Sequence, residues 1–194
     1  MADKLVRYGL SNVHYAIYDT STETYGDPVS WPGAVSLSLS PDGDTGTFWA
    51  DNIKYATFAN NGGYTGTLEM AADNDEIMVD LLGYIDDNGL IVEPTDATTV
   101  YFALMFEVSG NVRAQRTVLY CCTLARPSKD ANTKTDSTDP DTVSFDFEAS
   151  SLDFTIDGTT RNVVKATIEN TTANATVYET FMEAVLTPGS TTTE

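Results

Sequence analysis

Residues 33–52, GAVSLSLSPDGDTGTFWADN, begin with a strict alternation of apolar and polar positions. A period of two is typical of a half-buried strand, which packs one face on a core and exposes the other to water. The pattern therefore predicts a strand with a core face and a serine face. The core face consists of Val35, Leu37 and Leu39, and the serine face of Ser36, Ser38 and Ser40.

Two later stretches, residues 64–70 and 143–148, alternate in the same way. Each predicts another strand with one polar face. The polar positions of these two strands are Thr65, Thr67 and Glu69 in the first, and Ser144, Asp146 and Glu148 in the second.

Residues 100–108 and 116–124 differ, because they are nearly continuous hydrophobic runs on either side of Gly110-Asn111. They predict a hairpin whose strands are covered on both faces. Further predicted strands span residues 13–18, 152–156 and 163–169. The whole pattern predicts a single mainly-β domain over residues 1–194, without an internal repeat.

Two amphipathic stretches predict short helices. In DNDEIMVDLLG, residues 73–83, Asp73 is expected to cap the helix, Glu76 has the spacing of a capping box, and Gly83 is a natural stop. In TVYETFMEAV, residues 176–185, Thr176 and Glu179 repeat that spacing. We expect both helices to pack on the sheet of their own chain.

Long polar connections interrupt the strand pattern at about residues 41–63 and 127–142, and the chain ends in a polar tail, residues 187–194. The first two segments are expected to be loops, and the third is expected to be a flexible tail. The first is unusual because most loops in compact domains are far shorter, and because it contains several large apolar residues.

The net charge is −19, from 29 acidic and 10 basic residues. Such a surface repels nucleic acid, so direct binding of DNA or RNA is not expected. The start of the chain lacks the pattern of an export signal, and no segment is apolar for long enough to span a bilayer. The adjacent Cys121 and Cys122 are expected to be buried, reduced thiols of a protein made in a cytoplasm.

Recognisable chemistry is scarce. His14 has no second histidine or cysteine at a ligand spacing, so a structural role is expected. No nucleophile, phosphate-binding or dinucleotide-binding motif occurs, and the acid-rich turns do not continue as calcium loops. We therefore expect no enzyme activity, no cofactor and no metal. A catalytic pair of carboxylates stays open in so acidic a chain, but nothing in the sequence singles one out.

Five segments occur in an order that resembles one family. They are YGLSNVHYAIY, PGAVSLSLSPDGD, FWADNIKYATFANNGGYTGTLEMA, ALMFEVSG and RTVLYCCTLARPS. Together they are similar to the major tail protein, or tail-tube protein, of siphophages and prophages of Gram-positive bacteria. The resemblance covers residues 8–147 well and the remainder only loosely.

The resemblance implies a β-sandwich or barrel-type tail-tube fold with one short flanking helix and a possible C-terminal helix. Subunits of this family form hexameric rings that share an inner β-barrel, and the rings stack into the conduit for genome ejection. Implied partners are other copies of the chain and the tape-measure, tail-terminator and tail-tip proteins. The implied location is the virion tail, after synthesis in the bacterial host cytoplasm.

Within such a tube, the polar strand faces are expected to line the lumen. Genomic DNA would pass this wall without specific binding, since a negative wall repels it. The expected lumen residues are Ser36, Ser38, Ser40, Thr65, Thr67, Glu69, Asp146 and Glu148. The other interpretation is that these residues face the outer solvent.

The large apolar residues of the first long loop are expected to bury against a neighbouring subunit or ring, with Trp49 as the main anchor. They are Phe48, Trp49, Ile53, Tyr55 and Phe58. The alternative is that this loop folds back on its own sheet.

A different class of function is an adhesive or carbohydrate-binding β-sandwich on a particle or cell surface. Aromatic residues expected to be exposed would suit it: Tyr25, Trp31, Trp49 and Tyr55. The missing export signal and the lack of a clustered aromatic platform count against it.

Overall fold

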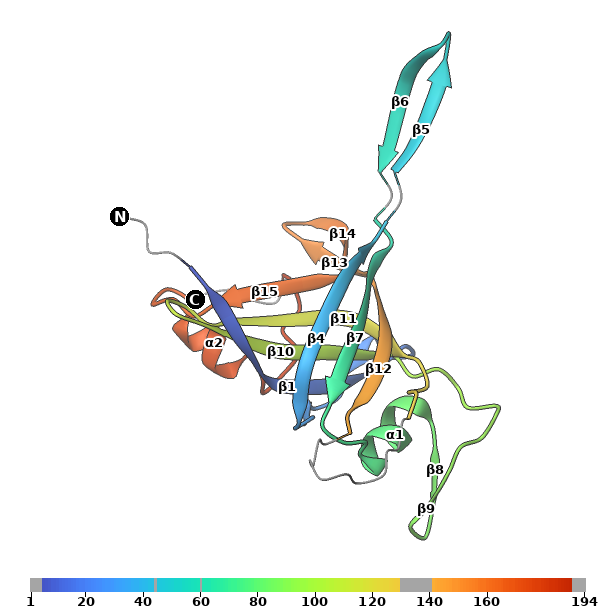
Figure 1. Ribbon diagram of the computed structural model, residues 1–194. Coiled ribbons are helices and arrows are strands. Elements are labelled where there is room, and N and C mark those ends of the chain that lie inside the picture. Colours follow the sequence, from blue (N-terminus) through green and yellow to red (C-terminus); the bar gives the residue numbers. More distant parts are fainter. Residues whose placement is uncertain (1–4, 44, 60, 130–140, 190–194) are drawn as a thin grey trace, which may run out of the picture.

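The computed structural model describes residues 5–43, 45–59, 61–129 and 141–189 (Figure 1). The strands are β1 (Arg7–Asp19), β2 (Thr24–Tyr25), β3 (Val29–Ser30), β4 (Ala34–Asp42), β5 (Thr45–Ala50), β6 (Ile53–Ala59), β7 (Gly63–Met70), β8 (Ile85–Asp87), β9 (Leu90–Val92), β10 (Phe102–Gly110), β11 (Gln115–Leu124), β12 (Val143–Ser150), β13 (Leu152–Ile156), β14 (Thr159–Val163) and β15 (Lys165–Glu169). The helices are α1 (Asp75–Leu82) and α2 (Ala175–Thr180).

The predicted mainly-β class is confirmed, because one large antiparallel sheet dominates the fold. Its strand order is β2-β1-β10-β11-β12-β7-β4, and β3 and β15 pair with β1 and β11. Strand β11 divides the sheet into two layers: its first half pairs with β15, whereas its last residues, Cys121–Leu124, pair with β12. Strands β12, β7 and β4 therefore cross over the layer formed by β1, β10 and β11 (Figure 1).

The main core lies between these two layers. Phe145 and Leu68 from the crossing layer, with Trp31, meet Tyr15 and Leu104 of the layer below. A second buried cluster covers the opposite face of β10 and β11, where Phe181 and the segment after α2 pack. The prediction that the two hydrophobic runs are covered on both faces is thus confirmed.

The cap of helix α1 lies one residue later than predicted, at Asn74. The side chain of Asn74 caps the helix by accepting a hydrogen bond from the Glu76 backbone N–H at 3.0 Å. Asp73 instead accepts a hydrogen bond from Lys129 at 2.6 Å, which holds the pKa of its carboxyl below the usual range. Gly83 ends the helix in the left-handed conformation, as predicted.

Helix α2 is shorter than predicted and does not use Thr176 as its cap. It begins after Asn174, whose side chain makes no capping hydrogen bond, so Thr176 lies inside the helix. Contacts with the sheet compensate: the Arg116 guanidinium lies 4.2 Å from the Tyr178 ring centroid and donates to the Tyr178 and Glu179 carbonyl oxygens. Arg116 also forms a largely buried ion pair with Glu107 at 2.8 Å.

The two expected loops and the expected tail have different outcomes. Residues 41–63 are not a loop, since β4 continues to Asp42, β7 begins at Gly63, and the hairpin β5–β6 lies between them. Most of the connection at 127–142 lies outside the described residues, as does the end of the tail at 187–194. Residues 187–189 contain no helix or strand, in agreement with the prediction.

Candidate functional site

The polar positions of β4, β7 and β12 form one continuous surface, which we call the polar face. The strands are neighbours in the sheet, and antiparallel partners project to the same side. Three cross-strand rows result: Ser36, Glu69 and Ser144; Ser38, Thr67 and Asp146; and Ser40, Thr65 and Glu148. All eight residues expected to line a lumen therefore lie together on one face.

Side-chain hydroxyl groups hold the carboxylates of the polar face. Glu69 accepts hydrogen bonds from Thr142 at 2.7 Å and from Ser36 at 2.8 Å, and Asp146 accepts one from Thr67 at 2.6 Å. The bonds from Thr142 and Ser36 hold the pKa of Glu69 below its usual value. Among the described residues, no ion pair neutralises Glu69, Asp146 or Glu148. The polar face is thus negatively charged.

The polar face is hollowed rather than flat. A depression of about 560 Å³ lies where β7, β12 and the end of β11 meet. Thr99 and Thr123 line it together with residues of the polar face, and Thr123 extends the third row because it pairs with Glu148. Sequence reasoning missed Thr99 and Thr123, because they lie outside the alternating segments.

The opposite side of the same strands packs on the core, with one exception. Leu37 and Leu39 contact the main core as expected. Val35 does not: it is 52% exposed. A register shift between Ala34 and Ser36 inserts Val35 as an additional residue in β4, so the alternation breaks at that point.

One edge of the polar face has no strand partner within the described residues, because β4 pairs with β7 alone. An unpaired edge exposes a row of backbone N–H and C=O groups that a strand of another molecule can bind. The polar face therefore ends at a surface that is chemically suited to extension.

The hairpin β5–β6, residues 45–59, projects far from the rest of the molecule (Figure 1), and we call it the arm. It turns at Asp51 and Asn52, which have φ angles of 53° and 62°. Two consecutive positive φ angles define the tight turn that matches the twist of a hairpin, and Asp and Asn tolerate them. This dipeptide between two aromatic-rich runs was a local signal for a hairpin.

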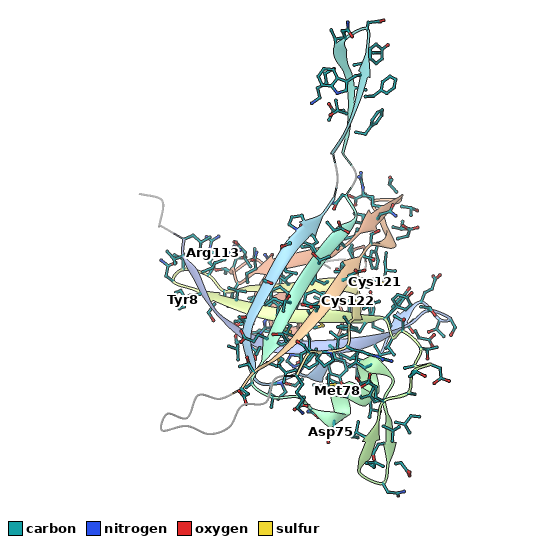
Figure 2. All side chains as sticks on the ribbon, turned by 45° about the vertical axis from the view of Figure 1, so that its right-hand side comes forward. Tyr8, Asp75, Met78, Arg113, Cys121 and Cys122 are labelled. Atoms are coloured by element: carbon teal, nitrogen blue, oxygen red, sulfur yellow. The ribbon has the colours of Figure 1, made fainter. Side chains whose placement is uncertain are left out.

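The five large apolar side chains of the arm are all exposed (Figure 2). Their exposed fractions are 55% for Phe48, 64% for Trp49, 60% for Ile53, 67% for Tyr55 and 65% for Phe58. The arm does not fold back on its own sheet. So many exposed aromatic groups on one projection are typical of a protein-protein contact.

The two faces of the arm differ. Phe48 and Phe58 lie on one face, because Phe58 pairs with Gly46, which is two residues before Phe48 in β5. The Tyr55 ring lies edge-on to the Phe48 ring, with 6.3 Å between the ring centroids. Trp49 and Lys54 are paired on the other face. The second face thus combines an aromatic ring with a cation.

The aromatic residues considered for carbohydrate binding do not gather on one surface. Trp31 is only 2% exposed, so its expected exposure is wrong. It is wedged between Tyr15 and Phe145, whose ring centroids lie 6.1 Å and 5.2 Å away, because the crossing of the two layers places it in the core. Tyr25 is half-buried and donates a hydrogen bond to the Tyr120 carbonyl oxygen.

The histidine and the two cysteines, which are the remaining candidates for chemistry, contact only other parts of the fold among the described residues. His14 contacts the Asn12 carbonyl oxygen at 3.0 Å through Nδ1. Cys121 and Cys122 are buried free thiols within the sheet (Figure 2), and burial raises the pKa of both. Across the described ranges, no three or more His, Cys, Asp or Glu side chains are grouped so that they could hold a metal ion.

The two helices in the described part of the chain are too short to cross a membrane.

No model of a known protein family matches the chain, and a search of curated proteins finds no match either.

Proposed function

We propose that this chain is a structural protein of a phage virion that polymerises as stacked hexameric rings into the tube of a long, non-contractile tail. The observation that carries the proposal is the polar face, which spans three neighbouring strands and ends at the unpaired edge of β4. The ordered resemblance to tail-tube proteins over residues 8–147 supports it independently.

The unpaired edge suggests how copies join. If a strand of a neighbouring copy pairs with β4, the polar face continues from one copy to the next, and closure of the ring removes the edge. The joined faces then form the wall of an inner β-barrel. The arm leaves the same strands at their end and provides a second contact, toward an adjacent ring.

The charge of the wall suits a conduit. Glu69, Asp146 and Glu148 repel the phosphate backbone, and serine and threonine hydroxyls give a wetted surface without cations. Basic residues would instead form salt-dependent contacts with phosphates and slow the passage of DNA. The protein would act by geometry, without catalysis or a cofactor, alongside the tape-measure, tail-terminator and tail-tip proteins.

Electron microscopy of the purified chain tests the proposal. We expect rings or hollow tubes, and a reconstruction in which Ser38, Thr67 and Asp146 face the central channel. Compact monomers at every concentration would instead favour an adhesive or carbohydrate-binding role. Tubes with the polar face on their outer surface would contradict the assignment of the lumen.

Assembly is expected to become easier as ionic strength rises. Copies that each carry a net charge of −19 repel one another, so apolar contacts must overcome this repulsion. The Debye length falls from about 10 Å at 0.1 M salt to about 3 Å at 1 M, which screens the repulsion. Sedimentation across a salt series measures the effect. Polymers that dissolve steadily as salt is added would show that attraction between opposite charges holds them together.

A further inference from the structure

A second exposed apolar surface lies on the short hairpin β8–β9. We call it the aliphatic patch, and its side chains are Ile85, Leu90 and Val92, which are 53%, 64% and 40% exposed. Ile85 pairs with Val92 and Asp87 pairs with Leu90, so these four side chains lie on one face of the hairpin. The aliphatic patch therefore has a carboxylate beside it.

The arm and the aliphatic patch lie at opposite ends of the molecule. In both views the arm extends from one end of the crossing strands, whereas β8–β9 lies beyond α1 at the other end (Figures 1 and 2). They cannot meet within one copy. A contact between the arm of one copy and the patch of the next is head-to-tail. Contacts of this kind build an open filament or stack, unless the rotation between copies closes them into a ring.

The charges of the two surfaces are complementary. Lys54 lies beside Trp49 on one face of the arm, and no ion pair involves it among the described residues. Asp87 lies beside Leu90 on the patch, and its carboxylate accepts a hydrogen bond from the side chain of its neighbour Asn88. An arm that docked on a second arm through the Trp49 face would instead bring two lysines together.

We propose that the Trp49 face of the arm docks on the aliphatic patch of the next copy, with Lys54 facing Asp87. The proposal rests on the proposed function, and it identifies the partner surface for the contact between rings. Trp49 would cover Leu90 and Val92, which removes large apolar groups of both copies from water. The ion pair at the edge would select the orientation.

The first test uses two assembly-deficient variants that are complementary. The arm variant carries Trp49→Ala and Lys54→Glu, and the patch variant carries Leu90→Ser and Val92→Ser. Because all four side chains are exposed or at the surface of a hairpin, both variants should fold, and circular dichroism checks this. Each variant alone should form no tubes. When the two variants are mixed, the intact arms of the patch variant should dock on the intact patches of the arm variant. The resulting complexes should contain one layer of each variant and grow no further, as measured by sedimentation velocity.

The second test exchanges the charges. Lys54→Asp should raise the concentration needed for polymerisation by about tenfold or more, and adding Asp87→Lys to the same chain should reverse most of that rise. Arg161→Glu is the matched control, because Arg161 is exposed on β14 and the substitution changes the net charge by the same amount as Lys54→Asp.

The outcomes separate the two proposals. Normal tubes from the patch variant, or no complex in the mixture, would overturn the docking site and leave the proposed function standing. Two-fold dimers that need only the arm would also overturn it, in favour of contact between arms. A wild-type chain that stays monomeric would overturn the proposed function together with this inference.

Discussion

Replacing residues 46–58 with the dipeptide Asn-Gly is expected to leave a folded monomer that no longer forms tubes. Thr45 and Ala59 are cross-strand partners, so a two-residue turn can join the chain there. The five apolar side chains of the arm are exposed, and their loss should change the free energy of unfolding by no more than about 0.5 kcal/mol. Denaturation in urea and sedimentation at high protein concentration measure the two effects.

A matched control keeps the arm and its apolar groups. Ala56 pairs with Phe48 on the face of the arm away from Trp49, and the variant Ala56→Ser retains all five apolar side chains. This variant should polymerise like the wild type. Tubes of normal length from the shortened chain would show that the arm is dispensable, and a shortened chain that fails to fold would show that the arm stabilises the monomer.

The substitution Gly66→Ala is expected to lower the free energy of unfolding by about 3 kcal/mol. Gly66 lies in β7 between Leu39 and Phe147, on the core side of the strands that carry the polar face. A Cβ atom there would lie 2.5 Å from Cζ of Phe147 and 2.7 Å from the Ser38 carbonyl oxygen. The Phe147 ring and β4 must move to make room, which also disturbs the polar face on the other side.

Gly46→Ala is the control for this substitution. Gly46 is also a strand glycine, and a Cβ atom added to it would lie no closer than 3.9 Å to the Phe58 carbonyl oxygen. Its unfolding free energy should match that of the wild type in a urea titration. Equal stability of both variants would mean that Phe147 and β4 are more adaptable than their close packing on Gly66 indicates.

The polar face shows how far local patterns reach. Alternation in three separate segments correctly identified which side chains share a face within each strand, because neighbouring residues of a strand always project to opposite sides. Alternation carries no information on which strand lies beside which. The alignment of Ser38 with Thr67 and Asp146, and the inclusion of Thr123, follow from the pairing of β4, β7, β12 and β11.

The errors have physical causes of the same kind. The expectation of a loop at residues 41–63 was based on the polarity and length of this segment. It did not take account of Asp51-Asn52, a dipeptide that can form a tight hairpin turn. The expectation that Asp73 caps α1 was wrong because Asn74, one residue later, provides the cap, while Lys129, distant in the chain, engages Asp73.

The order of residues was sufficient to identify the mainly-β class, the doubly covered β10 and β11, the polar and apolar sides of β4, β7 and β12, and the Gly83 end of α1. These depend on the local geometry of strands and helix ends, which side-chain order specifies directly. The three-dimensional fold was needed to show that Trp31 is buried, that Val35 is displaced outward, and that the arm and the aliphatic patch lie at opposite ends. Such features depend on contacts between distant segments, and only the packing of the two layers brings those segments together.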